Sequence, residues 1–144
     1  MDKWTPTFVD TWGWVALGHQ KDAHHEEVRA YIERAAEHHV PLYTTDYVLD
    51  ETITLVFRRE RFAEARTFIG RLLQAVDDGE LQREHITPSR FEAAWTLRRT
   101  FQDKPDISFT DLTSMAVMQE LGLSRVCTGD THFDQVGLGF ERVP

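Results

Sequence analysis

The chain has 144 residues, of which 41% are hydrophobic and 28% charged, and its formal net charge is −8. This size and composition predict one globular domain over residues 1–144. No apolar run approaches the roughly 18 residues of a transmembrane helix, and the first residues lack the apolar run of a signal peptide. We therefore expect a cytoplasmic protein without membrane contact. The single cysteine, Cys127, excludes an internal disulfide framework and is expected to fill the core.

The excess of acidic residues argues by itself against a nucleic-acid partner, because phosphate groups are bound mainly by positive charge. A cluster of acids that binds a cation would reverse this argument, since the metal inverts the local sign of the charge. The positions of the acids therefore matter more than their number.

Hydrophobic periodicity predicts strands that alternate with helices. In chain order the pattern indicates a strand over 7–12, a helix or turn from 14, a helix over 24–39, a strand over 40–45, helices over 46–58 and 62–76, a strand over 81–86, helices over 88–101 and 108–121, and strands over 125–128 and 140–143. Such alternation predicts an α/β fold with three layers, in which helices cover both faces of a central, mostly parallel sheet. Ligands of these sheets bind beyond the carboxyl ends of the strands, where the strand order reverses.

Four acids lie beside apolar runs rather than on clearly solvated faces. Asp10 and Asp130 each follow a predicted strand, whereas Glu51 and Asp111 lie in the first turns of predicted helices. All four are expected to meet at one edge of the parallel sheet.

Each acid also has a local explanation. Aspartate is a favoured helix N-cap, which suits Asp10, and the spacing from Ser108 suits Asp111 in a capping box. Glu51 could be a solvated helix residue or the partner of a nearby arginine, and Asp130 could be a turn residue. Taken together, the four positions favour a shared site over four separate explanations.

A cluster of carboxylates without cysteine or histidine ligands suits a hard cation such as Mg²⁺ or Mn²⁺. Without a cation, carboxylates this close would repel one another or take up protons. A metal held in this way can activate water and stabilise displacement at phosphorus, so the cluster indicates phosphodiester hydrolysis.

Four segments resemble the PIN-domain ribonucleases, in particular the VapC-like toxins of toxin–antitoxin systems. They are FVDTWGWVAL (8–17), TTDYVLDETITL (44–55), SFTDLTSMAVMQELGL (108–123) and VCTGDTHFDQVGL (126–138). The resemblance implies that the acids of these segments bind Mg²⁺ or Mn²⁺ directly or through water and are the catalytic residues: Asp10, Glu51, Asp111 and Asp130.

The same resemblance implies a small PIN-like domain that cleaves RNA and is inhibited by a small antitoxin protein covering the acidic site. A homodimer is also expected, because many relatives form dimers. Thr11, the hydroxyl next to the first acid, and Thr128, which begins the pattern T-x-D-x-x-F, are candidates for contact with the substrate. The family usually carries a further acid before the third motif, for which Asp106 is the candidate.

Several other side chains are candidates for contact with RNA. Arg58 and Arg59 could hold phosphates, or they could belong to a solvated helix face. His132 could touch substrate, although we favour a turn role. Trp12, Trp14 and Phe8 could stack on bases, but packing in the core or a dimer is at least as well supported.

The amphipathic helices 26–38 and 62–76 could form a groove for a partner helix, or could simply cover the core of the domain.

Two other functions remain open at this point. The first is a catalytically silent PIN-like module that binds protein or RNA. The second keeps the hydrolase but changes its substrate to DNA ends or flaps, which we rank last because 144 residues leave little room for the insertions such enzymes use.

Overall fold

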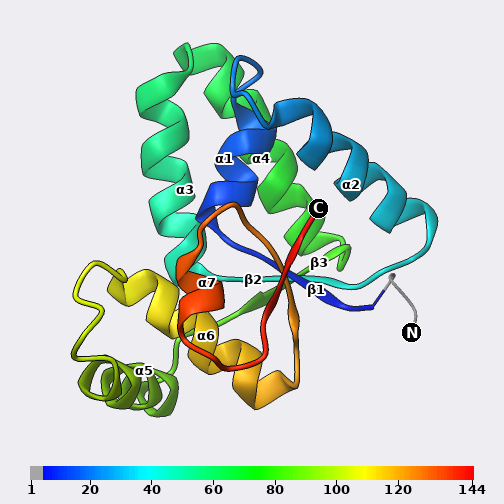
Figure 1. Cartoon of the computed structure of the whole chain (residues 1–144). Helices are drawn as coiled ribbons and strands as arrows, with labels where there is room; N and C mark the ends of the chain where they lie inside the picture. Colours follow the sequence, from blue (N-terminus) through cyan, green and yellow to red (C-terminus); the bar gives the residue numbers. More distant parts are fainter. Residues whose placement is uncertain (1–4) are drawn as a thin grey trace.

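The computed structural model describes residues 5–144, which form one parallel sheet with helices on both faces (Figure 1). The elements in chain order are β1 (Thr7–Val9), α1 (Thr11–Gly18), α2 (His25–Glu37), β2 (Leu42–Thr45), α3 (Asp46–Arg59), α4 (Phe62–Asp77), β3 (Leu81–Glu84), α5 (Pro88–Thr100), α6 (Phe109–Leu121), β4 (Arg125–Cys127), α7 (His132–Gln135) and β5 (Glu141–Val143).

The strands of the described chain are arranged in the order β3-β2-β1-β4-β5, and every pairing between them is parallel. Phe8 in the central strand pairs with Tyr43 of β2 on one side and with Val126 of β4 on the other. The chain builds outward from β1 through β2 to β3, and then returns to the other side of β1 for β4. The strand order therefore reverses between β1 and β4, and a ligand site is expected beyond their carboxyl ends.

Helices α1 to α4 lie on one side of the sheet in Figure 1, and α5 and α6 lie on the other. The central strand is fully buried, and Phe8 and Val9 belong to the main hydrophobic core. Helix α6 is buried from Asp111 to Met118, polar residues included, and it buries Leu112, Met115 and Met118 completely. The prediction of a three-layer α/β/α fold with a parallel sheet is confirmed.

The predicted strand over 7–12 was wrong beyond Val9. Asp10 leaves the strand with an extended backbone, and its carboxylate accepts a hydrogen bond from the Gly13 N–H, so the chain enters α1 at Thr11. Aspartate at this position favours the start of a helix over continuation of a strand. The short helix α7 was not expected, since its residues looked like a turn.

No helix in residues 5–144 is both long enough and apolar enough to cross a membrane. Cys127 is completely buried in the core beside β1, and this burial raises the pKa of its thiol well above the usual range. Cys127 is therefore a packing residue, as predicted.

Candidate active site

A cavity of about 470 Å³ lies where β1 and β4 end, and acids from several elements line it. Among the described residues the acids that face this cavity are Asp10, Asp22, Glu51, Asp106, Asp111 and Asp130. The structure thus brings all four predicted acids together with Asp106, the further candidate.

Asp10 caps helix α1 and faces the cavity at the same time. One carboxylate oxygen, Oδ1, accepts the Gly13 N–H at 3.1 Å, and the other, Oδ2, accepts the Thr128 hydroxyl at 2.8 Å. The side chain is almost completely buried, with 2% of its surface exposed. The capping role and the site role, which were alternatives from sequence, are both present in one side chain.

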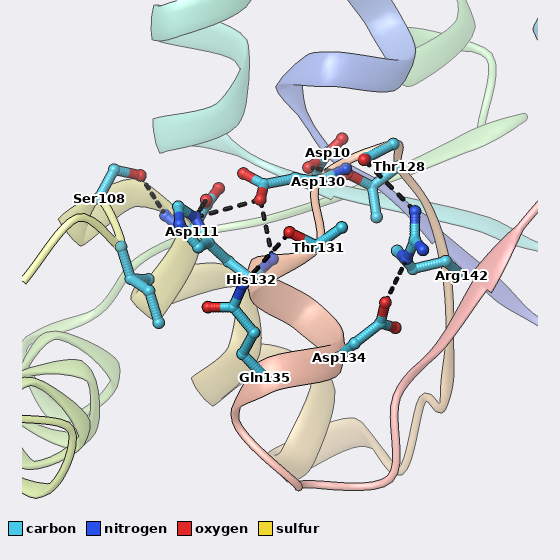
Figure 2. Close-up of polar contacts among 12 residues, drawn as sticks. Asp10, Ser108, Asp111, Thr128, Asp130, Thr131, His132, Asp134, Gln135 and Arg142 are labelled. Carbon is cyan, nitrogen blue, oxygen red and sulfur yellow. Dashed lines mark hydrogen bonds and ion pairs between the residues drawn. The ribbon is translucent and has the colours of Figure 1, made fainter. Parts of the chain in front are cut away.

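The loop after β4 is held by a chain of hydrogen bonds, which Figure 2 shows. The Asp130 N–H donates to the Thr128 hydroxyl at 3.0 Å, and the His132 N–H donates to Asp130 Oδ1 at 2.9 Å. From β5, Arg142 donates to the Gly129 carbonyl at 3.3 Å and to Asp134 Oδ2 at 2.8 Å. These bonds fix the direction in which Asp130 leaves its strand.

Asp111 contributes its backbone to the helix cap and its side chain to the cavity. The Asp111 N–H donates to Ser108 Oγ at 3.0 Å, so Ser108 caps α6. The Asp111 carboxylate lies 3.9 Å from Nδ1 of His132, on the side of Asp130, and makes no hydrogen bond to the Ser108 N–H. Asp111 is 8% exposed. A capping box was the alternative for this carboxylate, and the geometry does not form one.

Glu51 reaches the cavity from the middle of α3, with its neighbour Thr52 turned into the core. It is half-buried, and no ion pair within the described chain joins it to Arg58 or Arg59. Arg59 is exposed and lines the cavity, whereas Arg58 is exposed and lies outside it. Of the two arginines, only Arg59 is placed to reach a substrate in the cavity.

The two predicted threonines differ in their surroundings. Thr128 is 4% exposed, and its hydroxyl is occupied by Asp10 and by the Asp130 N–H, so it holds these acids rather than a substrate. Thr11 lines the cavity, and its buried hydroxyl has no hydrogen-bond partner among the described residues. A bound group in the cavity can supply that partner.

Comparison with known proteins places this geometry in a family. The family model described as PIN domain matches residues 7–138. The chain belongs to the PIN domain family. It is 37% identical over 133 residues to proteins described as 23S rRNA-specific endonuclease VapC20 in two strains of Mycobacterium tuberculosis, CDC 1551 / Oshkosh and ATCC 25618 / H37Rv. The match covers 90% of this chain and 93% of each relative.

The fold agrees with a solved structure of the same relative. A crystal structure of Mycobacterium tuberculosis VapC20, described as a sarcin-ricin loop cleaving toxin, superposes with a TM-score of 0.77 at 31% identity. The superposition covers 91% of this chain and 95% of the other.

Burial and mutual repulsion change the acidity of two carboxyls in this PIN domain. Burial raises the pKa of Asp10 to about 7, against the opposing effect of hydrogen bonds from Thr128 and Gly13, and the charges of Asp130 and Glu51 add to the increase. The pKa of Asp111 is also raised, first by burial and then by the charges of Asp10 and Asp130. A cation in the cavity would relieve this repulsion.

The donor atoms around the cavity fit a divalent metal ion. Asp111, Asp130 and His132 each offer one ligand atom, and these atoms lie within 4.8 Å of one another. The carboxylate oxygens and the unpartnered hydroxyl of Thr11 are hard ligands of the kind that Mg²⁺ and Mn²⁺ prefer. The residues present therefore fit the metal that the chemistry of the cluster requires.

Sequence reasoning missed Asp22 and undervalued His132. Asp22 lies in the polar loop between α1 and α2, where no apolar neighbour marks it as unusual. His132 has its Nδ1 atom 3.1 Å from Asp130 Oδ1 and lines the cavity, so it belongs with the acids as well as with the turn. The sequence feature that could have assigned His132 to the site is its position two residues after Asp130.

Proposed function

We propose that this PIN domain is a metal-dependent endoribonuclease that hydrolyses RNA phosphodiester bonds. The observation that carries the proposal is the convergence of Asp10, Glu51, Asp111 and Asp130, from four separate elements, on one cavity. The similarity to a relative described as a 23S rRNA-specific endonuclease supports RNA as the substrate. The catalytically silent alternative does not explain why Asp10 and Asp111 are buried, which raises their pKa values, and lie beside further acids that raise them more.

The four acids would hold Mg²⁺ or Mn²⁺, directly or through water. When bound, such an ion polarises a phosphate oxygen and lowers the pKa of a water molecule. The Gly13 N–H and the Thr128 hydroxyl keep the Asp10 carboxylate in a fixed orientation. Arg59, at the cavity wall, is placed to bind a phosphate oxygen of the RNA backbone.

The first test is cleavage of RNA by the purified protein with Mg²⁺ or Mn²⁺, and its loss with EDTA. The Asp10→Asn variant should cleave at least about 100-fold more slowly, the scale on which losing one charge-stabilising group slows an enzyme. Glu92→Gln is the matched control, since Glu92 is an exposed acid on α5 outside the cavity, and it should keep full activity. Activity that survives Asp10→Asn contradicts the assignment.

For the substrate, we propose ribosomal RNA, on the description of the relative alone. Incubation with intact ribosomes, followed by primer extension across the large-subunit RNA, tests this. One discrete new end, absent in the Asp10→Asn reaction, is the expected result, and diffuse cleavage of all RNA counts against it.

We further propose that the protein is the toxin of a toxin–antitoxin pair that works in the cytoplasm, inhibited by a small antitoxin, and that it forms a homodimer. A groove of about 1260 Å³ between α2 and α4 offers the antitoxin a surface, with apolar side chains such as Ile32 and Phe68 and charged ones such as Arg71. The product of a neighbouring short gene should copurify and abolish cleavage, and Arg71→Glu should weaken that binding.

The homodimer has its own test. Light scattering of the purified protein without antitoxin should give twice the mass of one chain.

A metal titration separates the silent-module alternative from the enzyme. If the cavity binds metal, millimolar Mg²⁺ or Mn²⁺ should raise the melting temperature of the wild-type protein, because a ligand that binds only the folded state stabilises it. A melting temperature that ignores both ions favours the silent module.

A further inference from the structure

We propose that Trp12 forms a stacking site for one unpaired RNA base at the rim of the acidic cavity. This proposal rests on the proposed ribonuclease function and deepens it, since it names a part of the substrate that the acids cannot recognise. Carboxylates and their metal act on phosphate, which is the same in every nucleotide.

Trp12 is placed differently from the other aromatic residues of the first segment. Phe8 is completely buried and Trp14 is 3% exposed, and the Trp14 indole N–H donates to Thr44 Oγ1 at 3.2 Å, so both belong to the core. Trp12 is only half-buried and lines the cavity, two residues after Asp10. No hydrogen-bond partner for its indole N–H lies within residues 5–144, which leaves a donor available to a ligand.

The indole of Trp12 is held in place by two loops. It packs so closely on Gly129, in the loop after β4, that a Cβ atom there would lie 2.4 Å from Cε2 and from Cζ2 of the indole. On the α1–α2 loop, the His24 ring contacts it with centroids 5.0 Å apart. Gly129 thus makes room for the ring, and the half-buried ring lines the cavity together with Asp130.

An aromatic ring at the cavity can contribute binding free energy that does not depend on charge. The chain carries a net charge of −8, so long-range electrostatics oppose RNA binding, and uncharged contacts at the site offset this repulsion. The other apolar side chains at the cavity, Val15 and Leu55, are aliphatic. Stacking of a base on an aromatic ring contributes about 1–3 kcal/mol and does not depend strongly on sequence. A paired base has both faces covered, so the ligand is an unpaired base.

The test measures RNA binding apart from cleavage, in the Asp10→Asn background. Single-stranded oligoribonucleotides about eight nucleotides long, within the site sizes of known single-strand binders, serve as the probe. Trp12→Leu should weaken binding, read by anisotropy of labelled RNA, by about tenfold or more, whereas Trp12→Phe should restore most of the affinity. Trp95→Leu is the matched control, because Trp95 is 47% exposed on α5, away from the cavity.

Tryptophan fluorescence gives a second readout that a structural role would not produce. Unlabelled single-stranded RNA should quench the emission of the parent protein, and this quenching should disappear in Trp12→Phe but persist in Trp95→Leu. The same oligonucleotide annealed to its complement should quench much less. Melting temperature and its shift with Mg²⁺, measured in the wild-type background, establish that each Trp12 variant is folded with its metal site intact.

Each outcome distinguishes this proposal from the proposed function. If the wild-type protein cleaves RNA but Trp12→Leu binds RNA as tightly as its parent, the stacking site is wrong and the nuclease stands. If no RNA is cleaved but binding depends on Trp12, the stacking site stands and the nuclease is wrong. If the protein binds no RNA, the stacking site and the nuclease are both wrong. If Trp12→Leu instead weakens binding of a copurifying protein, Trp12 belongs to a protein interface.

Discussion

Thr128 connects two acids that lie far apart in the sequence. Its hydroxyl donates to the Asp10 carboxylate and accepts the backbone N–H of Asp130, so one small side chain orients the Asp10 carboxylate and holds the backbone of Asp130. Groups that hold metal ligands in this way commonly change metal affinity by about 10- to 100-fold when they are removed. The precision of the site thus depends on a residue that does not line the cavity.

Replacing this hydroxyl should weaken metal binding. Thr128→Val keeps the shape of the side chain but leaves Asp10 without one of its donors, so the Mg²⁺ dissociation constant should rise about 10- to 100-fold. The lost buried hydrogen bonds should also lower the free energy of unfolding by about 1–3 kcal/mol. Calorimetric titration and thermal denaturation measure the two effects. Thr128→Ser, which keeps the hydroxyl, is the control, and equal Mg²⁺ affinity in the Val and Ser variants would contradict the role.

At the residue scale, the sequence predicted the acids of the site better than the residues that hold them in place by hydrogen bonds. Asp10 and Asp130 were recognisable because an acid at the end of an apolar strand is unusual. The hydroxyl direction of Thr128 was not predictable, because it depends on how β4 lies beside β1. Asp22 could not be found, since its neighbours in the sequence are as polar as those of any surface loop.

Helix α1 lies unusually close to the sheet, and Gly13 permits this approach. A Cβ atom at Gly13 would lie 2.8 Å from the carbonyl oxygen of Cys127 and 2.9 Å from a methyl group of Val9. The first turn of the helix therefore sits against the ends of β1 and β4. The N–H of the same residue donates to the Asp10 carboxylate that caps the helix.

We expect Gly13→Ala to destabilise the protein, although alanine is normally the better helix residue. The backbone carbonyl of Cys127 cannot move away easily, so overpacking should cost about 1–3 kcal/mol. Gly70→Ala is the matched control: it lies in α4 with no atom within 4 Å of the new Cβ, and it should stabilise by up to about 1 kcal/mol. Chemical denaturation of the two variants measures this difference, and a stabilised Gly13→Ala would show that the close approach is not required.

At the element scale, periodicity predicted most helices within a few residues. It failed at β1 and α7, where local hydrogen bonds rather than apolar spacing decide the structure. The cap formed by Asp10 ended a strand that hydrophobicity would have continued. Residues of α7 make a single turn after Thr131, which is too short for a helical period to be visible.

At the scale of the whole molecule, ionising the buried acids of the cavity has a large cost in free energy. The pKa of Asp10 rises from 3.8 to about 7 in the folded protein. One pKa unit corresponds to about 1.4 kcal/mol, so ionising this carboxyl without a metal costs a large part of the stability of a small protein. Packing elsewhere in the fold therefore offsets the free-energy cost of burying this carboxyl among other acids.

Stability of the metal-free protein should consequently fall as the pH rises. A carboxyl with a raised pKa binds more protons in the folded state than in the unfolded state between about pH 4 and pH 7, so its stabilising effect is complete below that range and is lost above it. Melting temperatures in EDTA should be higher at about pH 5 than at about pH 8, and Asp10→Asn should flatten this slope. Mg²⁺ should restore stability mainly at the higher pH, since it competes with protons for the same oxygens. A slope unchanged by Asp10→Asn would place its origin elsewhere.

At the scale of the whole molecule, the order of the strands was the least predictable feature. Alternating strands and helices indicated a parallel sheet, but nothing in the sequence of β4 specifies that it lies beside β1 rather than beyond β3. Convergence of the acids was inferred from their positions at strand ends and from the resemblance to PIN domains. The four positions taken together already favoured a shared site over four local explanations, and the resemblance added RNA as the expected substrate.

The reversal of strand order between β1 and β4 also determines when the site can exist during synthesis. Asp10 is made before β2, β3 and most of the helices, whereas Thr128 and Asp130 are made only after them. A growing chain that has not reached β4 lacks both an acid and the hydroxyl that orients Asp10. The complete acidic site can therefore assemble only once β4 and the loop that follows it have been made.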